Sequence, residues 1–308
     1  MNTLGNTIVT ACDRNYLWGA YILVASLRIG GSKDPIHVLA DGFTDEDKVL
    51  LEQFKDVEVF DVVEKTHHCM ALQKPDAILT ADTELISWID SDCMIIGNVD
   101  HLFRSDCNRF QIRTRDEAEV AEQYSRLYFD SDIIGEVPRR ILDCWKGDIG
   151  ERQEPLLKQS VVDNCFVLNR GHIPFIKKWK RQMINVLSES SGLVDRQNEA
   201  YFMSDESVIT SLLAFADDAP CISEYQFDRD PNSYLVHFSL SPKPWQAWTR
   251  NSFRFYNQLM ELLFKASEQG YKMPAKPFSL REGNKLLCYM DSHCRRYHDY
   301  ILKLFNSS

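Results

Sequence analysis

Short apolar runs alternate with amphipathic segments in the first hundred residues. Four runs rich in β-branched or apolar residues predict strands, at residues 7–10, 35–39, 57–63 and 85–89. The run Leu85–Ile89 carries no charge, which is typical of a strand covered on both faces. Helices are predicted from Trp18 to Arg28 and from Thr44 to about Phe54, the second beginning with a hydroxyl cap and an acidic first turn. This alternation predicts an α/β fold with a largely parallel central sheet.

The pattern is less regular in the second half of the chain. Residues 104–160 are charged, and we expect them to cross over the sheet with at least one helix. Further elements are predicted as a strand over residues 160–168 and helices over residues 173–187 and 204–215. From Asn251 onward the pattern is mostly helical, with more basic than acidic side chains. We therefore expect one domain over residues 1–250 and a helical extension over residues 251–308.

The composition excludes several classes of protein. The chain has 308 residues, of which 44% are hydrophobic and 26% charged, so it can bury a full-sized core. Its 35 Lys and Arg against 45 Asp and Glu give a net charge of −10, which argues against nucleic-acid binding. We expect no transmembrane segment, because no apolar run approaches about 20 residues. We also expect no signal peptide, because the first dozen residues lack Lys and Arg.

The cysteines indicate a reducing compartment. There are nine, an odd number, and no two have the Cys-x-x-Cys spacing of a zinc ribbon. A disulfide framework is therefore not expected, and most of the cysteines are interpreted as buried thiols that pack as small hydrophobic groups. A catalytic thiol remains the alternative, although no histidine is placed in sequence to serve it. A cytoplasmic location follows from this interpretation.

The tripeptide Asp90-Ser91-Asp92 is the candidate metal site. It directly follows the uncharged run Leu85–Ile89. Side chains two residues apart on an extended backbone face the same way, so both carboxylates can meet one cation. Ligands in open parallel sheets bind beyond the carboxyl ends of the strands, and carboxylates together with phosphate oxygens suit Mn²⁺ or Mg²⁺.

The Asp-x-Asp spacing alone is weak support for a metal site. The same spacing recurs at residues 45/47, 130/132 and 228/230. A solvated turn or a helix cap is the ordinary explanation for an isolated pair of this kind. The pair Asp90 and Asp92 differs because only this pair follows a five-residue strand without a charge.

The segment Ile89–Phe103 resembles the metal-site segment of glycosyltransferase family 8. The family pattern is Asp-x-Asp, apolar residues, and then Asn-x-Asp-x-Leu-Phe, all of which are present here. The resemblance implies a GT-A-type nucleotide-diphospho-sugar transferase fold. In that fold a mixed, mostly parallel central sheet is flanked by helices, and here a helical C-terminal appendage follows. The resemblance covers roughly residues 7–250, with the middle poorly matched.

A second segment, His237–Trp245, is similar to the C-terminal signature of the same family, in which five residues separate a histidine from Lys-Pro-Trp. The resemblance implies that His237 is the third metal ligand and that Lys243 holds the donor diphosphate. A structural histidine is the alternative. The chain departs from the family at Leu240, where a glycine is usual.

The N-terminal segment Ile8–Tyr16 resembles the family's first strand and nucleotide loop. By this resemblance Ala11 offers its backbone to the base, and Asp13 accepts from the uracil ring N–H. Asn15 and Tyr16 would complete the nucleoside site. The alternative is an ordinary strand-to-helix loop in which Asp13 is a cap.

Weaker correspondences concern the donor sugar. Residues 162–167 occupy the place of the family's sugar-contacting strand, so Asn164 is expected to touch the sugar. Asp205 is expected to bind sugar hydroxyls. Glu206 replaces the usual glutamine near the anomeric carbon, where its charge could stabilise a cationic transition state. Helix capping is the alternative for both residues. Lys74 is the candidate for the family's basic residue near the donor.

The resemblance implies a retaining glycosyltransferase that uses Mn²⁺, or else Mg²⁺, to move a hexose from a UDP-sugar to a glycan, glycolipid or protein. Glu206, Asp205 and Asp163 are the candidate nucleophiles. The alternatives are a sugar-nucleotide hydrolase, a nucleotidyltransferase, or a non-catalytic nucleotide-sugar-binding module. The basic, aromatic segment Arg295–Tyr300 suggests contact with an anionic glycolipid or a membrane surface, with an ordinary packed helix as the alternative.

Overall fold

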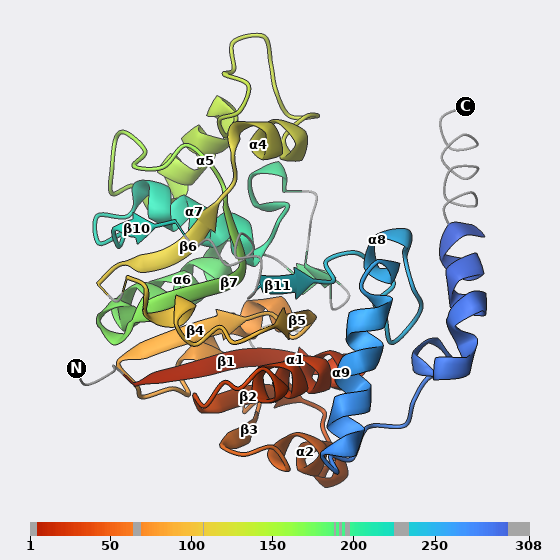
Figure 1. Ribbon diagram of the computed structural model, residues 1–308. Helices are drawn as coiled ribbons and strands as arrows, with labels where there is room; N and C mark the ends of the chain where they lie inside the picture. Colours follow the sequence, from red (N-terminus) through yellow and green to blue (C-terminus); the bar gives the residue numbers. More distant parts are fainter. Residues whose placement is uncertain are drawn as a thin grey trace.

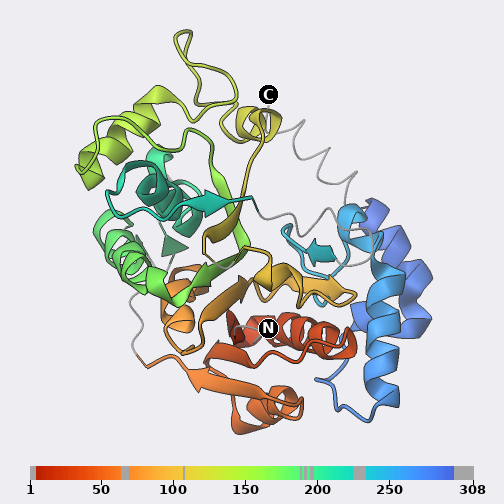
Figure 2. The same cartoon turned by 60° about the vertical axis from the view of Figure 1, so that its left-hand side comes forward.

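A mixed seven-stranded sheet forms the centre of the protein (Figure 1). The computed structural model describes residues 5–63, 69–106, 108–187, 189–190, 193–194, 198–224 and 234–294. The strands of the central sheet are β1 (Asn6–Asp13), β2 (Ile36–Asp41), β3 (Val57–Asp61), β4 (Leu85–Ile89), β6 (Phe110–Thr114), β7 (Val161–Asn169) and β10 (Ile222–Ser223). Their spatial order is β10-β6-β7-β4-β1-β2-β3. In Figure 2 the sheet runs from orange β3 at one edge, through the red strand β1 and the green strand β7, to teal β10 at the other edge.

The sheet is mostly parallel, as expected from the sequence. β1 pairs in parallel with β2 and β4, β2 with β3, and β6 with β10. β7 runs antiparallel to both of its neighbours, β4 and β6. The sheet and its helices match the expected α/β class.

Two short antiparallel ribbons accompany the sheet. One pairs β5 (Cys93–Ile96) with β11 (Tyr234–His237), and the other pairs β8 (Glu189–Ser190) with β9 (Leu193–Val194). The β5–β11 ribbon joins two segments about 140 residues apart in sequence. It therefore brings the segment that ends at His237 next to the residues that follow β4.

Helices cover both faces of the sheet. The α-helices include α1 (Leu17–Ile29), α2 (Asp45–Glu52), α3 (Lys74–Ile78), α4 (Glu117–Gln123), α5 (Arg139–Ile149), α6 (Ile173–Val186), α7 (Asp205–Phe215), α8 (Arg250–Phe253) and α9 (Tyr256–Glu268). Consecutive residues of β1 point to opposite faces: Ile8 belongs to the core cluster that includes residues of α1, α2 and α9, whereas Val9 belongs to the cluster that includes residues of α3, α5, α6 and α7. All five residues of β4 are buried, which confirms the prediction of a strand covered on both faces.

Most of the predicted elements are present with small changes at their ends. The second predicted helix is α2, which begins with the expected capping box between Thr44 and Asp47. The charged segment 104–160 contains α4 and α5, as expected, but it also contributes strand β6 of the main sheet, which was not predicted from the sequence. The β5–β11 ribbon was also not predicted. Phe110 and Ile112 of β6 are buried and alternate with Gln111 and Arg113, but these five residues lie within a charged segment that was interpreted as irregular.

Helix α9 packs against helix α1. Leu259 and Leu263 of α9 belong to the same hydrophobic core as α1, and Cys288 of the helical residues 285–294 joins it. The segment Arg295–Tyr300 lies outside the described residues. Among the described residues, no helix has the length and apolar character needed to cross a bilayer.

The cysteines only partly match their interpretation. The buried ones are Cys12, Cys93, Cys165 and Cys288, whereas Cys144, Cys221 and Cys294 are exposed. All the described cysteines are free thiols, so no disulfide is formed among them.

Candidate functional site

The tripeptide Asp90-Ser91-Asp92 forms the turn between β4 and β5. The backbone N–H of Cys93 donates to the Asp90 carbonyl at 3.1 Å, which closes the turn. Helix α1 comes very close to it at Gly19, where an added Cβ would lie 2.6 Å from the Ser91 carbonyl oxygen. A residue without a side chain is therefore required at position 19 for this packing. No motif in the sequence singled out Gly19.

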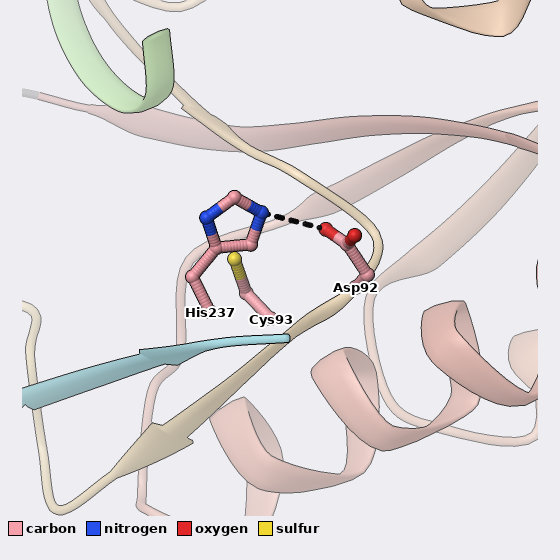
Figure 3. Close-up of side chains that lie close together, drawn as sticks. All are labelled: Asp92, Cys93 and His237. Carbon is pink, nitrogen blue, oxygen red and sulfur yellow. Dashed lines mark ion pairs between the residues drawn. The ribbon is translucent and has the colours of Figure 1, made fainter. Parts of the chain in front are cut away.

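The β5–β11 ribbon brings His237 to the two aspartates. In this antiparallel pair His237 lies opposite Cys93, and the N–H of Phe238 donates to the Asp92 carbonyl at 3.0 Å. The His237 Nε2 atom is 3.2 Å from Asp92 Oδ1 and 3.8 Å from Asp90 Oδ2. Figure 3 shows the imidazole directed toward the Asp92 carboxylate. The three side chains singled out as metal ligands thus lie together.

Charge at this site favours an ionised Asp92. Burial favours the neutral form of this carboxyl group, but the hydrogen bond from His237 and the charges of His237 and Lys243 outweigh it and lower the pKa of Asp92 to about 2. Burial likewise opposes the charged imidazole, yet Asp92 and Asp90 raise the pKa of His237 above its usual value. The site therefore has an ionised carboxylate beside a nitrogen that holds a proton readily.

Two alternative third ligands accompany Asp92 and His237. Ligand atoms of Asp92, Cys93 and His237 all lie within 4.8 Å of one another (Figure 3). However, burial and the charges of Asp92 and Asp90 raise the pKa of the Cys93 thiol well above its usual value, and the thiolate is the form that binds metals. Asp90 supplies the oxygen that hard cations prefer. The donor set of Asp90, Asp92 and His237 therefore fits Mn²⁺ or Mg²⁺.

Lys243 contacts the candidate metal site through Asp92. Its buried Nζ donates to Asp92 Oδ2 at 2.7 Å and to the carbonyl oxygens of Phe238 and Ser239 at 2.7 and 3.2 Å. All three ammonium protons have partners within the protein. The contact with a donor diphosphate that the resemblance implies therefore requires Lys243 to exchange one of these partners.

A second buried lysine joins three carboxylates from separate elements. The Nζ of Lys74, at the start of α3, is 2.9 Å from Asp163 Oδ2 of β7, 2.9 Å from Asp205 Oδ2 of α7 and 3.1 Å from Asp90 Oδ1. Burial disfavours the charged lysine, but the three carboxylates raise its pKa well above the usual value. Trp88 also donates to Asp90 Oδ1 at 2.9 Å. Lys74 thus links the metal site to the residues expected to bind the sugar.

The two acidic residues at the start of α7 are buried side by side. Burial and the neighbouring Asp163 raise the pKa of Asp205 well above the usual value, although Lys74 opposes this. Burial also raises the pKa of Glu206 against the effect of Arg115. Ser204 before them has φ 53° and ψ −120°, a conformation that costs a non-glycine residue backbone strain. Strain of this kind is often retained at functional sites.

A cavity of about 400 Å³ adjoins both groups of charges. Five of the residues singled out from the sequence line it: Asp90, Asp163, Asn164, Glu206 and His237. Four more of these residues do not line the cavity itself. Lys74 contacts Asp90, and Asp205 contacts Lys74. Asp92 contacts both His237 and Lys243. The Asn164 carbonyl also accepts from the Asp90 N–H at 2.8 Å.

The predicted nucleotide loop lies beside the metal site. Asp13 caps the 3₁₀ turn Arg14–Tyr16 by accepting from the Asn15 N–H at 2.9 Å, as the alternative interpretation of Asp13 predicted. The Tyr16 ring packs edge-on against Trp245, and Trp245 Nε1 donates to the Asn15 carbonyl at 3.2 Å. Burial together with the negative charges of Asp92, Asp13 and Asp90 raises the pKa of Tyr16 to about 12. The Tyr16 hydroxyl is therefore close enough to these carboxylates to be affected by their charge. Ala11 lies buried near the end of β1.

Fold and site together define the class: the chain has the architecture of the GT-A glycosyltransferases. Its fold is similar to the bifunctional glycosyltransferase WbbM, with a TM-score of 0.54 and 12% identity over 89% of this chain and 52% of that chain. It is also similar to the galactosyltransferase LgtC, solved with donor and acceptor sugar analogues, with a TM-score of 0.51 and 14% identity over 88% of this chain and 98% of that chain.

Sequence similarity points to the same class. The chain is 32% identical over 110 residues to glycogenin-1 of Caenorhabditis elegans, which is 31% of this chain and 25% of that protein. The chain thus matches only a quarter of that relative's length. No family model matches the chain. The similarity to glycogenin-1 bears out the resemblance that the motifs indicated, and the solved structures confirm the expected fold.

Proposed function

We propose that this protein is a metal-dependent retaining glycosyltransferase that moves a hexose from a UDP-sugar to a hydroxyl group of a glycan, glycolipid or protein. The observation that carries this proposal is the convergence of Asp90, Asp92 and His237 beside the 400 Å³ cavity. The proposal includes residues 1–250 as the catalytic domain and residues 251–308 as its helical extension.

The metal side of the cavity would hold the donor diphosphate. A divalent cation, when bound, supplies positive charge to the departing nucleoside diphosphate. Asp90, Asp92 and His237 would hold that cation, with Mn²⁺ as the first candidate. Lys243 keeps the Asp92 carboxylate in place at 2.7 Å. On the nucleoside side, Ala11, Asp13, Asn15 and Tyr16 would bind the uracil and ribose.

The sugar side of the cavity would orient the hexose. Asn164 and Asp205 are the proposed hydroxyl-binding residues, and Lys74 holds Asp205 in place at 2.9 Å. Glu206 lies on the cavity wall, where a carboxylate can stabilise positive charge at the anomeric carbon. Retention of configuration rests on the family resemblance. The carboxylates to test as nucleophiles are those of Glu206, Asp205 and Asp163. Each is paired with a positively charged side chain, Arg115 for Glu206 and Lys74 for the two aspartates.

A non-catalytic nucleotide-sugar-binding protein is the main alternative. Leu240, where the family usually has glycine, would favour that alternative if its side chain closed the diphosphate site. Leu240 is 53% exposed and does not line the cavity. This observation favours the transferase.

Calorimetry with UDP, with and without Mn²⁺, tests the nucleotide and the metal together. The transferase requires Mn²⁺-dependent UDP binding and slow release of free sugar from one of UDP-glucose, UDP-galactose, UDP-N-acetylglucosamine or UDP-xylose. Tight binding without release from any donor would favour the binding protein instead. Fast release that acceptors do not change would favour a hydrolase, and consumption of a nucleoside triphosphate would favour a nucleotidyltransferase.

A further inference from the structure

An arginine that the sequence did not single out is paired with Glu206 on the cavity wall. Arg115 Nη1 is 2.8 Å from Glu206 Oε1, and Arg115 Nη2 is 3.1 Å from Glu206 Oε2. The two side chains are only 15% and 9% exposed. Such a two-pronged pair fixes the plane of the carboxylate as well as its position, because the guanidinium is planar and always charged.

Arg115 is itself held rigidly by the beginning of β7. Its backbone N–H donates to the Ser160 carbonyl at 2.9 Å, and its guanidinium donates to the Val161 carbonyl. Gln123, at the end of α4, donates to Glu206 Oε1 at 3.4 Å and accepts from the Ser160 hydroxyl at 2.5 Å. The orientation of Glu206 is therefore set by two other elements besides its own helix.

Charged groups of both signs surround Glu206. Those that influence it are Arg115 after β6, Asp163 of β7 and Lys74 of α3, while Tyr124 faces it from the end of α4 and Asp205 precedes it on α7. Arg113 and Glu119, which pair with each other, complete the charged lining of the cavity. Burial and Asp163 raise the pKa of Glu206, and Arg115 is the strongest influence that opposes them. Loss of Arg115 would therefore raise the pKa of Glu206 further and favour its protonated form.

We propose that Arg115 is a positioning residue that keeps Glu206 ionised and aimed into the cavity, where the carboxylate stabilises positive charge on the donor sugar. This inference rests on the proposed glycosyl transfer. Arg115 forms and breaks no bond to the substrate and acts only through Glu206. Because transition states of glycosyl transfer develop positive charge at the anomeric carbon, a fixed anion beside it lowers the barrier.

The charge of Glu206 can be measured without turnover. Carbon NMR of protein labelled at the glutamate carboxyl groups gives the pKa of each, and Glu206→Gln identifies the signal of Glu206. In Arg115→Met the pKa of Glu206 is expected to rise by about 1–3 units, because the opposite charge is lost. In Arg115→Lys it is expected to rise less. An unchanged pKa in Arg115→Met overturns the proposal.

Kinetics of sugar release from the UDP-sugar test the consequence of that charge. Arg115→Met is expected to lower kcat about 100-fold with little change in KM. The acidic limb of the profile of kcat against pH is expected to move to higher pH. In a Glu206→Gln background the same substitution is expected to change neither kcat nor the limb. An equal loss of kcat in both backgrounds would mean that Arg115 acts elsewhere, and would overturn the proposal.

Folding controls separate positioning from structural support. Arg104 and Asp34 form a similar two-pronged pair away from the cavity, so Arg104→Met is the matched control and is expected to leave the pH profile unchanged. If Arg115→Met does not fold, Arg115→Lys carries the same two tests, with smaller expected changes in the pKa of Glu206 and in kcat. Absence of Mn²⁺-dependent UDP binding by the unaltered protein would contradict the proposed function, whereas the NMR titration still decides the charge of Glu206.

Discussion

Two aspartates at the cavity, Asp92 on the metal side and Asp205 on the sugar side, have opposite surroundings of charge. On the metal side, His237 and Lys243 both contact the one carboxylate of Asp92, and its pKa falls to about 2. On the sugar side, Asp205 shares the ammonium group of Lys74 with Asp163 and also with Asp90 of the metal side, and the pKa of Asp205 rises well above its usual value. Both aspartates are largely buried. The local balance of charge therefore decides which of them stays ionised.

The two sides of the cavity differ in whether a bound cation can replace a positive charge of the protein. The proton on His237 can leave when a divalent cation arrives, so the metal side is suited to exchange one positive charge for another. Lys74 has no such replacement, because it is fully engaged with three carboxylates. We expect the metal side to govern ligand binding and the sugar side to govern stability and the geometry of the donor.

The largest effect is expected on stability from Lys74→Met. The substitution leaves three buried carboxylates without their cation, which should lower the free energy of unfolding by about 3–5 kcal/mol. Urea denaturation followed by circular dichroism measures the loss. Lys178 is the matched control, since it pairs with Glu151 and Asp218 at the surface, each at 2.6 Å. Lys178→Met should cost at most about 1 kcal/mol, and equal losses would contradict the contrast between the two sites.

Asp92→Asn should remove metal binding without unfolding the protein. Mn²⁺-dependent affinity for UDP should fall by more than the roughly 10–100-fold that follows loss of a partner outside the ligand shell. Calorimetry with UDP and Mn²⁺ measures the change. Asp130→Asn is the control, because Asp130-Ser131-Asp132 repeats the tripeptide on an exposed loop. A similar loss in both variants would argue against Asp92 as a ligand.

Mn²⁺ affinity should also depend on pH through His237. Because Asp92 and Asp90 raise the pKa of His237, a proton competes with the metal up to a higher pH than for a free histidine. Affinity should therefore fall by about tenfold per pH unit below that pKa, and should level off above it. Asp92, with a pKa of about 2, adds no dependence near neutral pH. His237→Gln should bind Mn²⁺ more weakly and lose this pH dependence. Retention of the same slope in that variant would exclude His237 as the competing group.

The smallest expected effect comes from the strained residue before Asp205. Ser204→Gly should stabilise the protein by about 0.5–1 kcal/mol, because glycine adopts a φ of 53° without strain, although it loses more entropy on folding. Thermal denaturation measures the gain. Ser207→Gly, three residues further in the first turn of α7, should instead destabilise by about 0.5–1 kcal/mol. A loss of stability in Ser204→Gly would show that this backbone conformation carries no strain.

The elements with strong local patterns were predicted most closely. The uncharged run Leu85–Ile89 is β4 with the same bounds, and the capping box at Thr44 begins α2. The strand β6 was missed because its five residues lie in a charged segment, and its place between β7 and β10 is set by pairing with distant strands. The β5–β11 ribbon was missed for the same reason, because its two strands are far apart in the chain.

The sequence by itself determined that Asp90 and Asp92 follow a buried strand and that a His and a Lys-Pro-Trp segment occur further along the chain. These are local features, since backbone alternation and short spacing control them. Only the tertiary structure decided that Arg115 faces Glu206, 91 residues away, and that Lys74 holds three carboxylates from separate elements. The charge state of each group depends on the sum of burial and all neighbouring charges in space, and chain order does not record that sum.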